Sequence, residues 1–233
     1  FCIYNNDLYT FIGQKVYRFN YAKNEFVFCL TLPDSDGNIR FAQAYMGKLW
    51  IFVNNSGLYK IDMSTFKIED HYTLLTDYEG NSLRTFYIDK KGYIWFGTID
   101  GIYIFDPTDG KLSHYKHSRT DPFSLPNNSI WEISEDRQSN VWIGTYSGTL
   151  CYVNIDENNA FKTYHPQNSG LNHTPVSAFA EDQQYLWVGT EGGGINRMNK
   201  ATGEFSYITS ANSITSNNIK SLITDAGHNL WIS

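Results

Sequence analysis

The sequence has few charged residues and no long apolar run. Only 18% of its 233 residues are charged and the formal net charge is -6, so it lacks the basic excess that binding to nucleic acid or anionic lipid requires. The longest apolar runs reach five or six residues, far below the roughly 20 that a membrane-spanning helix needs. We therefore expect no nucleic-acid partner and no membrane span in this segment.

Cysteine is also scarce, with Cys2, Cys29 and Cys151 widely separated along the chain. They lack the paired spacing of a zinc site, and we expect small buried apolar residues. An initiating methionine and a signal-peptide pattern are missing too, which suggests a segment of a longer protein. What the sequence has in abundance is aromatic residues, at 16% with 17 Tyr, 15 Phe and 6 Trp, a bias that favours strands over helices.

The tryptophans mark a repeat. They recur at intervals of 45, 47, 45 and 44 residues, as Trp50, Trp95, Trp142, Trp187 and Trp231, and Tyr9 extends the series backward. An aspartate precedes the last four by five or six residues, as Asp89, Asp136, Asp182 and Asp225. A glycine follows three of them by six residues, as Gly101, Gly148 and Gly193. A period of about 45 residues is typical of an array of equivalent structural units.

One period reads as four short strands. Around Trp142 the pattern predicts strands over 129–135, 141–145, 150–155 and 161–164, separated by turn residues. Four antiparallel strands in about 45 residues are typical of a β-propeller blade. The predicted fold is therefore all-β, a segment of a β-propeller. The approximate blades are 1–32, 38–73, 82–116, 128–165, 174–209 and a partial 217–233 in one propeller region.

The shared residues have structural explanations. The glycine after each tryptophan would supply the positive φ of a hairpin turn. The aspartate would hydrogen-bond its own turn, and the tryptophan would pack one blade against the next. We therefore look for function at positions where the repeats differ.

The repeated phrase resembles a known family. Its first part appears as Ile130-Trp-Glu-Ile-Ser-Glu-Asp136 followed by Val141-Trp-Ile-Gly-Thr145. Its closing part appears in the preceding copy as Asp106-Pro-Thr-Asp-Gly-Lys-Leu-Ser-His-Tyr115. This pattern is similar to the regulator-propeller repeat of two-component sensors. The resemblance is strong around Trp95, Trp142 and Trp187, and weaker around Trp50 and Tyr9.

The resemblance implies the periplasmic sensor part of a hybrid histidine kinase and response regulator of gut bacteria. Such a receptor detects oligosaccharides from polysaccharide breakdown and controls transcription of glycan-utilisation genes. It would act as a homodimer, with a further propeller and with transmembrane and kinase domains in the same chain. The segment itself would not be an enzyme and would need no cofactor. A propeller of this family has about seven blades, so we expect part of a larger ring.

The candidate ligand-binding residues are those that differ between repeats. The second residue of each predicted first strand is Arg40, Arg84, Trp131, Ser177 or Lys220, and the hairpins between second and third strands add Asp100, Tyr146 and Glu191. If the first strand is innermost, these side chains gather at the mouth of the central channel. Three cations and an indole would suit an acidic oligosaccharide. The alternative interpretation is a set of ordinary polar groups at a wet channel rim.

Other motifs and functions are less well supported. The stretch 34–38 begins like a calcium loop, but Ile39 and Tyr45 occupy positions where the loop needs Gly and Glu. Glu132, Glu135 and Asp136 could be imagined as an acid and base pair for sugar cleavage, yet Asp136 belongs to the repeated turn. A carbohydrate-active hydrolase or lyase and a dimerisation scaffold without ligand remain the alternatives to a sensor.

Overall fold

The computed structural model describes residues 1–33, 37–75, 83–121, 123–146, 150–154, 161–164, 166–167, 169–227 and 229–233. Within these ranges the regular structure is all β-strand and no residue is helical. The same ranges accordingly contain no helix of the length and apolarity that crossing a membrane requires. Two compact units are present, unit 1 over Phe1–Ile88 and unit 2 over Asp89–Ser233.

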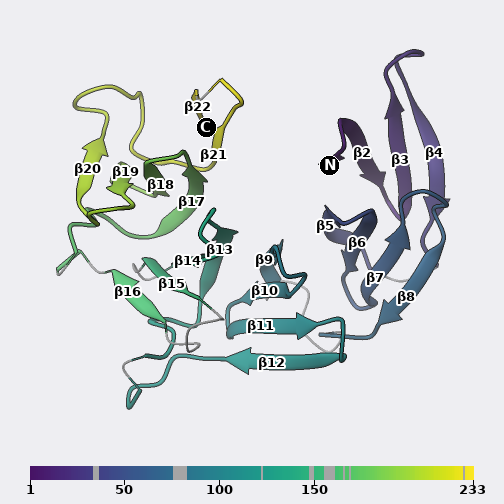
Figure 1. Cartoon of the computed structure of the whole chain (residues 1–233), viewed down its shortest axis with the longest axis horizontal. Helices are drawn as coiled ribbons and strands as arrows, with labels where there is room; N and C mark the ends of the chain where they lie inside the picture. The colour runs from purple at the N-terminus through teal and green to yellow at the C-terminus, as the bar shows by residue number, and fades with distance from the viewer. Residues whose placement is uncertain are drawn as a thin grey trace. The chain divides into compact units, whose positions relative to one another are not determined.

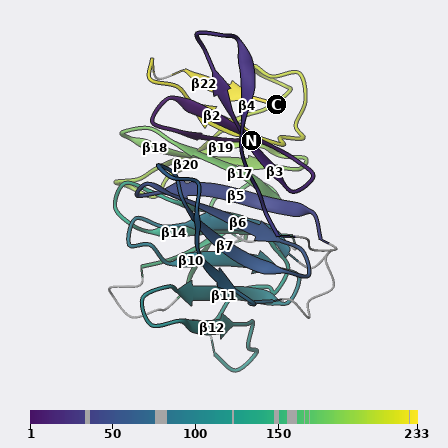
Figure 2. The same ribbon diagram turned by 90° about the vertical axis from the view of Figure 1, so that its right-hand side faces the viewer.

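Unit 1 contains two antiparallel four-stranded sheets, in the orders β1-β2-β3-β4 and β5-β6-β7-β8, and ends with β9 (Figure 1). Their bounds are β1 (Cys2–Tyr4), β2 (Asp7–Ile12), β3 (Lys15–Asn20), β4 (Glu25–Thr31), β5 (Ile39–Tyr45), β6 (Lys48–Val53), β7 (Gly57–Asp62), β8 (Ile68–Tyr72) and β9 (Leu83–Ile88). Figure 2 shows β5, β6 and β7 running side by side, as their pairing requires. Sequence neighbours thus pair as hairpins, the connectivity of a propeller blade.

Unit 2 continues the pattern with β10, β11 and β12 paired in that order, two four-stranded sheets, and the pair β21-β22. Their bounds are β10 (Ile94–Thr98), β11 (Gly101–Asp106), β12 (Lys111–Tyr115), β13 (Ile130–Glu135), β14 (Val141–Thr145), β15 (Leu150–Val153), β16 (Lys162–Tyr164), β17 (Val176–Glu181), β18 (Tyr185–Thr190), β19 (Gly194–Asn199), β20 (Phe205–Ile208), β21 (Leu222–Thr224) and β22 (Leu230–Ile232). We call β13 to β16 blade 4 and β17 to β20 blade 5. The predicted all-β fold with four-stranded antiparallel blades is confirmed, and so are the four strands predicted for blade 4.

The repeated aspartate binds both its own turn and the repeated tryptophan, an arrangement that we call the turn clamp. The sequence predicted the bonds to the turn but not the bond to the indole. In blade 4, Asp136 Oδ1 accepts hydrogen bonds from the backbone N–H groups of Gln138 and Asn140, both at 2.9 Å, as predicted for a turn. Its Oδ2 accepts a further bond from Trp142 Nε1 at 2.8 Å. The same indole bond recurs at Asp89, Asp182 and Asp225, at 2.8 to 2.9 Å. One carboxylate therefore ties the first hairpin turn to the second strand of each of these repeats.

The role predicted for the shared glycine needs correction. Gly101 has φ of 104°, as expected, but Gly193 does not have a positive φ; its neighbour Gly194 has φ of 71° instead. Gly148 lies outside the described residues. Gly57, Gly101 and Gly194 each begin the third strand of a sheet, where an added Cβ would lie 2.2 to 2.4 Å from a carbonyl oxygen of the fourth strand. Close backbone approach, and not the turn alone, requires glycine here.

Neighbouring blades of unit 2 are packed through residues that recur in the repeat. Trp142 of blade 4 clusters with Leu186, Val188 and Met198 of blade 5, as predicted for the shared tryptophan. Gly144, two residues further along, leaves no room for a side chain, because a Cβ there would lie 2.8 Å from a methyl carbon of Val176. The glycine of the Trp-x-Gly-Thr phrase thus accommodates the first apolar residue of the next blade.

The three cysteines are free thiols, and the burial expected for them is found at two of the three. Cys2 and Cys151 are buried, whereas Cys29 is only half-buried. Burial raises the pKa of the Cys151 thiol well above its usual range, which makes it an inert core residue.

Candidate functional site

Three of the candidate positions, Arg40, Trp131 and Ser177, coincide with β-bulges. In β13, Ile130 pairs with Thr145 and Glu132 with Gly144, so Trp131 is the extra residue. The register shifts in the same way at Ser177 in β17 and at Arg40 in β5. A bulge bends its strand and redirects one side chain away from the regular alternation. Alignment of the repeats identified these positions, but the bulge itself was missed because no residue type marks it.

The first strands of successive repeats lie next to one another within each unit. In unit 1, β5 contacts β9, and in unit 2, β13 contacts β17 and β17 contacts β21. Ser177 Oγ donates a hydrogen bond to the Ile219 carbonyl oxygen at 2.6 Å. Arg40 Nη2 donates to the Leu83 carbonyl oxygen at 3.5 Å. Both bonds run from a bulge residue to the first apolar position of the following repeat, so these side chains also connect neighbouring strands.

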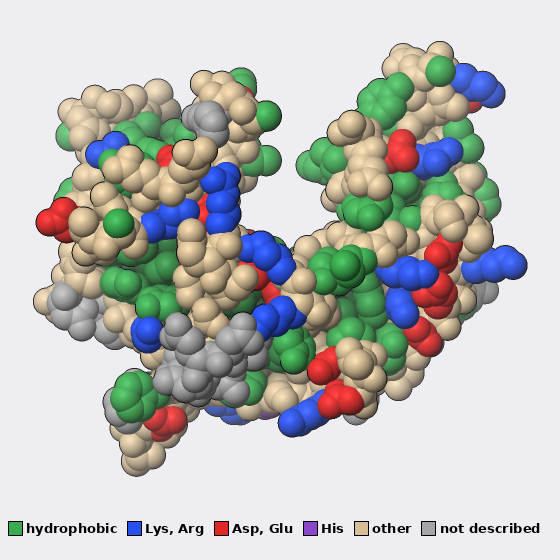
Figure 3. Space-filling view, in the orientation of Figure 1, with side chains coloured by type: hydrophobic (Ala, Val, Ile, Leu, Met, Phe, Trp, Pro, Cys, Tyr) green, Lys and Arg blue, Asp and Glu red, His purple; other side chains and the backbone are tan. Residues whose placement is uncertain are grey.

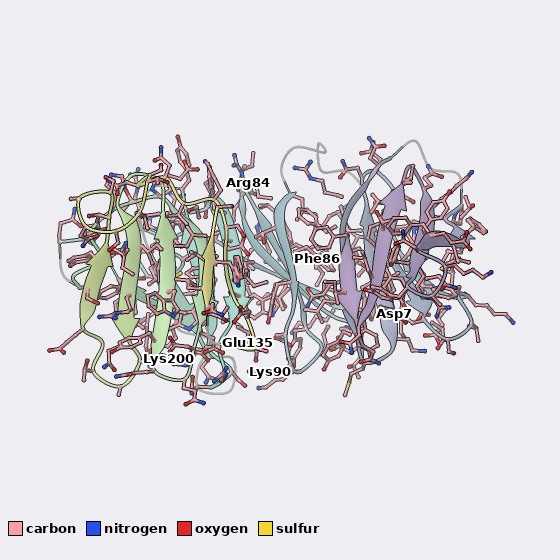
Figure 4. All side chains as sticks on the ribbon, turned by 90° about the horizontal axis from the view of Figure 1, so that it is seen from above. Asp7, Arg84, Phe86, Lys90, Glu135 and Lys200 are labelled. Carbon is pink, nitrogen blue, oxygen red and sulfur yellow. The ribbon has the colours of Figure 1, made fainter. Side chains whose placement is uncertain are left out.

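Unit 1 contributes two arginines. Arg40 and Arg84 are both exposed, and Arg40 reaches the carbonyl of Leu83, the residue before Arg84. The Arg40 guanidinium carbon lies 5.7 Å from the ring centre of Phe41, which stacks on Phe86 at 6.2 Å. Figure 4 shows Arg84 at one edge of the unit, beyond Phe86. Guanidinium groups on a rigid aromatic support suit carboxylate or sulfate recognition.

Unit 2 contributes an aromatic pair. The rings of Trp131 and Tyr146 lie 5.4 Å apart at an interplanar angle of 30°. Tyr146 is 55% exposed, and its backbone N–H donates to the Ser129 carbonyl oxygen at 2.9 Å, which holds it beside the start of β13. The structure thus brings together two residues selected from different parts of one repeat. Such a pair offers apolar ring surface at a wet edge, as in many binding sites for small polar ligands.

The predicted cation of unit 2 is paired with an acid. Lys220 forms an ion pair with Glu191, another candidate. Glu191 is itself fixed by its backbone N–H, which donates to the Pro175 carbonyl oxygen at 3.0 Å. Since this acid offsets the charge of Lys220, the unit 2 candidates are largely neutral and aromatic. Convergence of the three cations on one ligand stays a prediction.

The carboxylates considered for sugar cleavage have other roles. Glu135 accepts a hydrogen bond from the Lys90 backbone N–H at 2.8 Å and lies 3.8 Å from the Lys90 ammonium; Figure 4 shows the two side chains at one edge of unit 2. Asp136 belongs to the turn clamp. Burial raises the pKa of the third, Glu132, to about 7. Among the described residues, no group of three or more His, Cys, Asp or Glu could hold a metal ion.

Three segments of the chain, residues 77–100, 124–147 and 170–192, match the family model described as two component regulator propeller. These three segments are similar to two-component regulator propeller repeats. Each matched segment contains the first strand of a repeat, β9, β13 or β17, and extends past the Trp-x-Gly-Thr phrase of the second strand. The resemblance drawn from the sequence is confirmed.

A curated relative is "Histidine kinase P4" of Formosa agariphila, 27% identical over 241 residues. The match covers 95% of this chain but only 17% of that protein. The chain therefore corresponds to a small part of the relative.

Among solved structures, PorZ of Porphyromonas gingivalis, a surface component of the type-IX secretion system, shares the fold with a TM-score of 0.67 at 16% identity. That match covers 94% of this chain and 35% of PorZ. The extracellular domain of a putative one-component system from B. thetaiotaomicron matches at a TM-score of 0.48 and 20% identity, over 98% of this chain and 38% of that one.

Proposed function

We propose that this chain is part of the extracytoplasmic sensor region of a hybrid two-component receptor. The receptor would detect oligosaccharides released from polysaccharide and control glycan-utilisation genes through a histidine kinase in the same protein. The observation that carries the proposal is the match of three repeats to the regulator-propeller family. Similarity to a protein named as a histidine kinase over 95% of this chain supports it.

The ligand would lie on the bulged first strands. Within unit 1, Arg40 and Arg84 would bind acidic groups of an oligosaccharide. Within unit 2, Trp131 with Tyr146 would stack on a sugar ring. Lys220 and Glu191, held as an ion pair, would offer a donor and an acceptor to hydroxyl groups. The chain performs no chemistry in this scheme, and it signals only if the ligand contacts one receptor arrangement, for example one form of a homodimer, better than another.

The bonds made by Ser177 and Arg40 to the following repeat favour a second candidate, a scaffold that binds no glycan. In that case the bulge residues would serve only to connect strands. The two candidates differ in whether the arginines contribute to binding.

Isothermal titration calorimetry with oligogalacturonates and sulfated oligosaccharides would test the sensor proposal. Arg84→Ala should weaken binding about tenfold or more, because a charge-assisted hydrogen bond contributes about 1.5–3 kcal/mol. Trp131→Ala should also weaken it, and neither change should lower the melting temperature. Arg18→Ala is the matched control, because Arg18 is a half-exposed arginine of β3 in the same unit. Unchanged affinity in both variants would favour the scaffold, and turnover of a bound glycan would indicate an enzyme.

A further inference from the structure

A concave site lies within unit 2, between blade 4 and blade 5. It is a cleft of about 540 Å³, within the roughly 300–1,000 Å³ common for small-molecule sites. On the blade 4 side it is lined by the first hairpin turn and by Trp142, Tyr152 and Tyr164. On the blade 5 side it is lined by the hairpin turns that follow β17 and β19.

Three aromatic side chains form the blade 4 wall of the cleft. Trp142 lies opposite Tyr152 on the paired strand, with ring centres 4.7 Å apart, and Tyr164 lies 5.9 Å from Trp142 and 6.2 Å from Tyr152. Trp142 is buried, whereas both tyrosines are half-buried. The phenolic hydroxyls form no hydrogen bond with any other residue that the structure describes. The wall therefore combines ring surface with two polar groups able to bind a ligand.

Three exposed glutamines surround this wall. Gln138 comes from the first turn of blade 4, and Gln183 and Gln184 come from the corresponding turn of blade 5. Their side-chain amides make no hydrogen bond within the described part of the chain. Asp136 and Asp182 accept hydrogen bonds from the backbone N–H groups of Gln138 and Gln184, and not from their amides. Each amide offers both a donor and an acceptor.

The cleft offers no uncompensated charge. Asp136 is engaged by the indole N–H of Trp142 and by its own turn. Lys200, which also lines the cleft, donates from Nζ to Glu181 Oε2 at 2.9 Å and to the Asp182 carbonyl oxygen at 2.7 Å. Figure 3 shows basic and acidic side chains side by side on this face of unit 2. Charged ligands would gain little here, because the existing pairs already satisfy the charges.

We propose that this cleft binds a neutral saccharide. Sugar rings present an apolar C–H face and equatorial hydroxyls, which match the aromatic wall and the ring of amides. The cleft is separate from the site proposed for acidic oligosaccharides. Trp131 lies near the start of β13, whereas Glu135 ends β13 and is followed by Asp136, which lines the cleft. Figure 4 shows Lys200 at the same edge of unit 2 as Glu135. At about 3.3 Å per residue, the two ends are roughly 13 Å apart.

The cleft depends on a residue that the other repeats do not share. The partner of the repeated tryptophan on the third strand is Tyr152 in blade 4, but it is Lys60, Ile104 or Arg197 in other repeats. Lys60 and Arg197 lie over their own tryptophans as cations. Among these four repeats, only blade 4 has an aromatic residue opposite its tryptophan. The blade therefore folds with other residues at this position, and Tyr152 is not required for the fold itself.

Titration calorimetry with neutral trisaccharides would test this cleft, using cellotriose, maltotriose, xylotriose and mannotriose as probes. At least one should bind, with a dissociation constant of about 1 mM or lower. Tyr152→Ile, which copies the residue of the third repeat, should weaken binding about tenfold or more. The double change Gln183→Ala with Gln184→Ala removes only exposed side chains and should weaken it about fivefold. Tyr21→Ile, at an exposed tyrosine of unit 1, is the matched control and should leave affinity unchanged.

Three results would overturn the proposal that the cleft binds a neutral saccharide. The first is that none of the four probes binds, and the second is that both cleft variants bind with the affinity of the parent. The third is that Trp131→Ala loses binding of the neutral sugar, because this would place the sugar at Trp131 and not in the cleft. The proposed function fails separately, if acidic oligosaccharides bind without regard to Arg84 while the trisaccharide still needs Tyr152.

Discussion

Single residues at the bulges carry most of the difference between repeats. Arg40, Trp131 and Ser177 occupy one structural position but offer a cation, an indole and a hydroxyl. Because a bulge residue is not tied to the regular face alternation, its side chain varies without disturbing the core. The next position in the strand is more constrained, because its side chain is partly buried, as the raised pKa of Glu132 shows.

Glu132 is expected to make stability depend on pH. Burial raises its pKa to about 7 in the folded chain, against an ordinary value of 4.5, while the backbone N–H of Ile133 acts in the opposite direction. The folded state then binds more protons than the unfolded state, so the contribution of Glu132 is fully present below about pH 4.5 and is lost as pH rises through 7. The loss is at most about 3 kcal/mol.

Glu132→Gln should remove this slope and stabilise the chain at pH 8 relative to the parent. Urea unfolding at pH 5 and pH 8 measures the difference. Glu181→Gln provides the comparison, because Glu181 forms ion pairs with Lys200 and Arg137 and its loss should not stabilise the chain. Identical pH profiles for parent and Glu132→Gln would contradict the assignment.

At the scale of elements, the turn clamp and the blade interface meet in one side chain. Trp142 donates to Asp136 and packs against Leu186, Val188 and Met198. Trp231 makes the same bond to Asp225 but is 61% exposed. Comparing Trp142 with Trp231 therefore separates the contribution of the indole–carboxylate hydrogen bond to stability from the contribution of burying the ring.

Trp142→Phe should cost about 1 to 3 kcal/mol of unfolding free energy, because it removes the bond to a buried carboxylate and leaves a void between blades. Trp231→Phe should cost clearly less, since water can replace the lost partner there. Chemical denaturation of both variants measures the difference. Equal losses would mean that the interface contributes little.

Across the whole molecule, burial follows the same order in successive repeats. The second strands β10 and β14 are buried along their entire length, whereas the fourth strands β4, β8 and β12 are mostly exposed or half-buried. A fourth strand is also the edge of its sheet, so part of its backbone is unpaired. Stability should therefore be graded within every blade.

Hydrogen exchange followed by mass spectrometry should show this gradient. Amides of the second strands β6, β10, β14 and β18 should exchange slowest, and those of the fourth strands should exchange fastest. The third strands serve as the internal reference, because they pair on both sides. Protection of fourth strands equal to that of second strands would contradict a graded blade.

The sequence by itself determined the period, the strand pattern and the resemblance to regulator-propeller repeats, because each depends on local chemistry repeated at a constant interval. Asp136 and Trp142 recur for a reason that acts within a single hairpin, so spacing reveals it. The selection of Trp131 and Tyr146 was also accessible, since both lie where repeats differ.

Only the tertiary structure decided which of these side chains meet. The bulge at Trp131, the ion pair between Lys220 and Glu191, and the cleft beside Tyr152 depend on registers and on the packing of one blade against the next. These contacts join residues far apart in sequence, and no local pattern encodes them, because a repeat specifies its own sheet while the approach of two sheets depends on both surfaces at once.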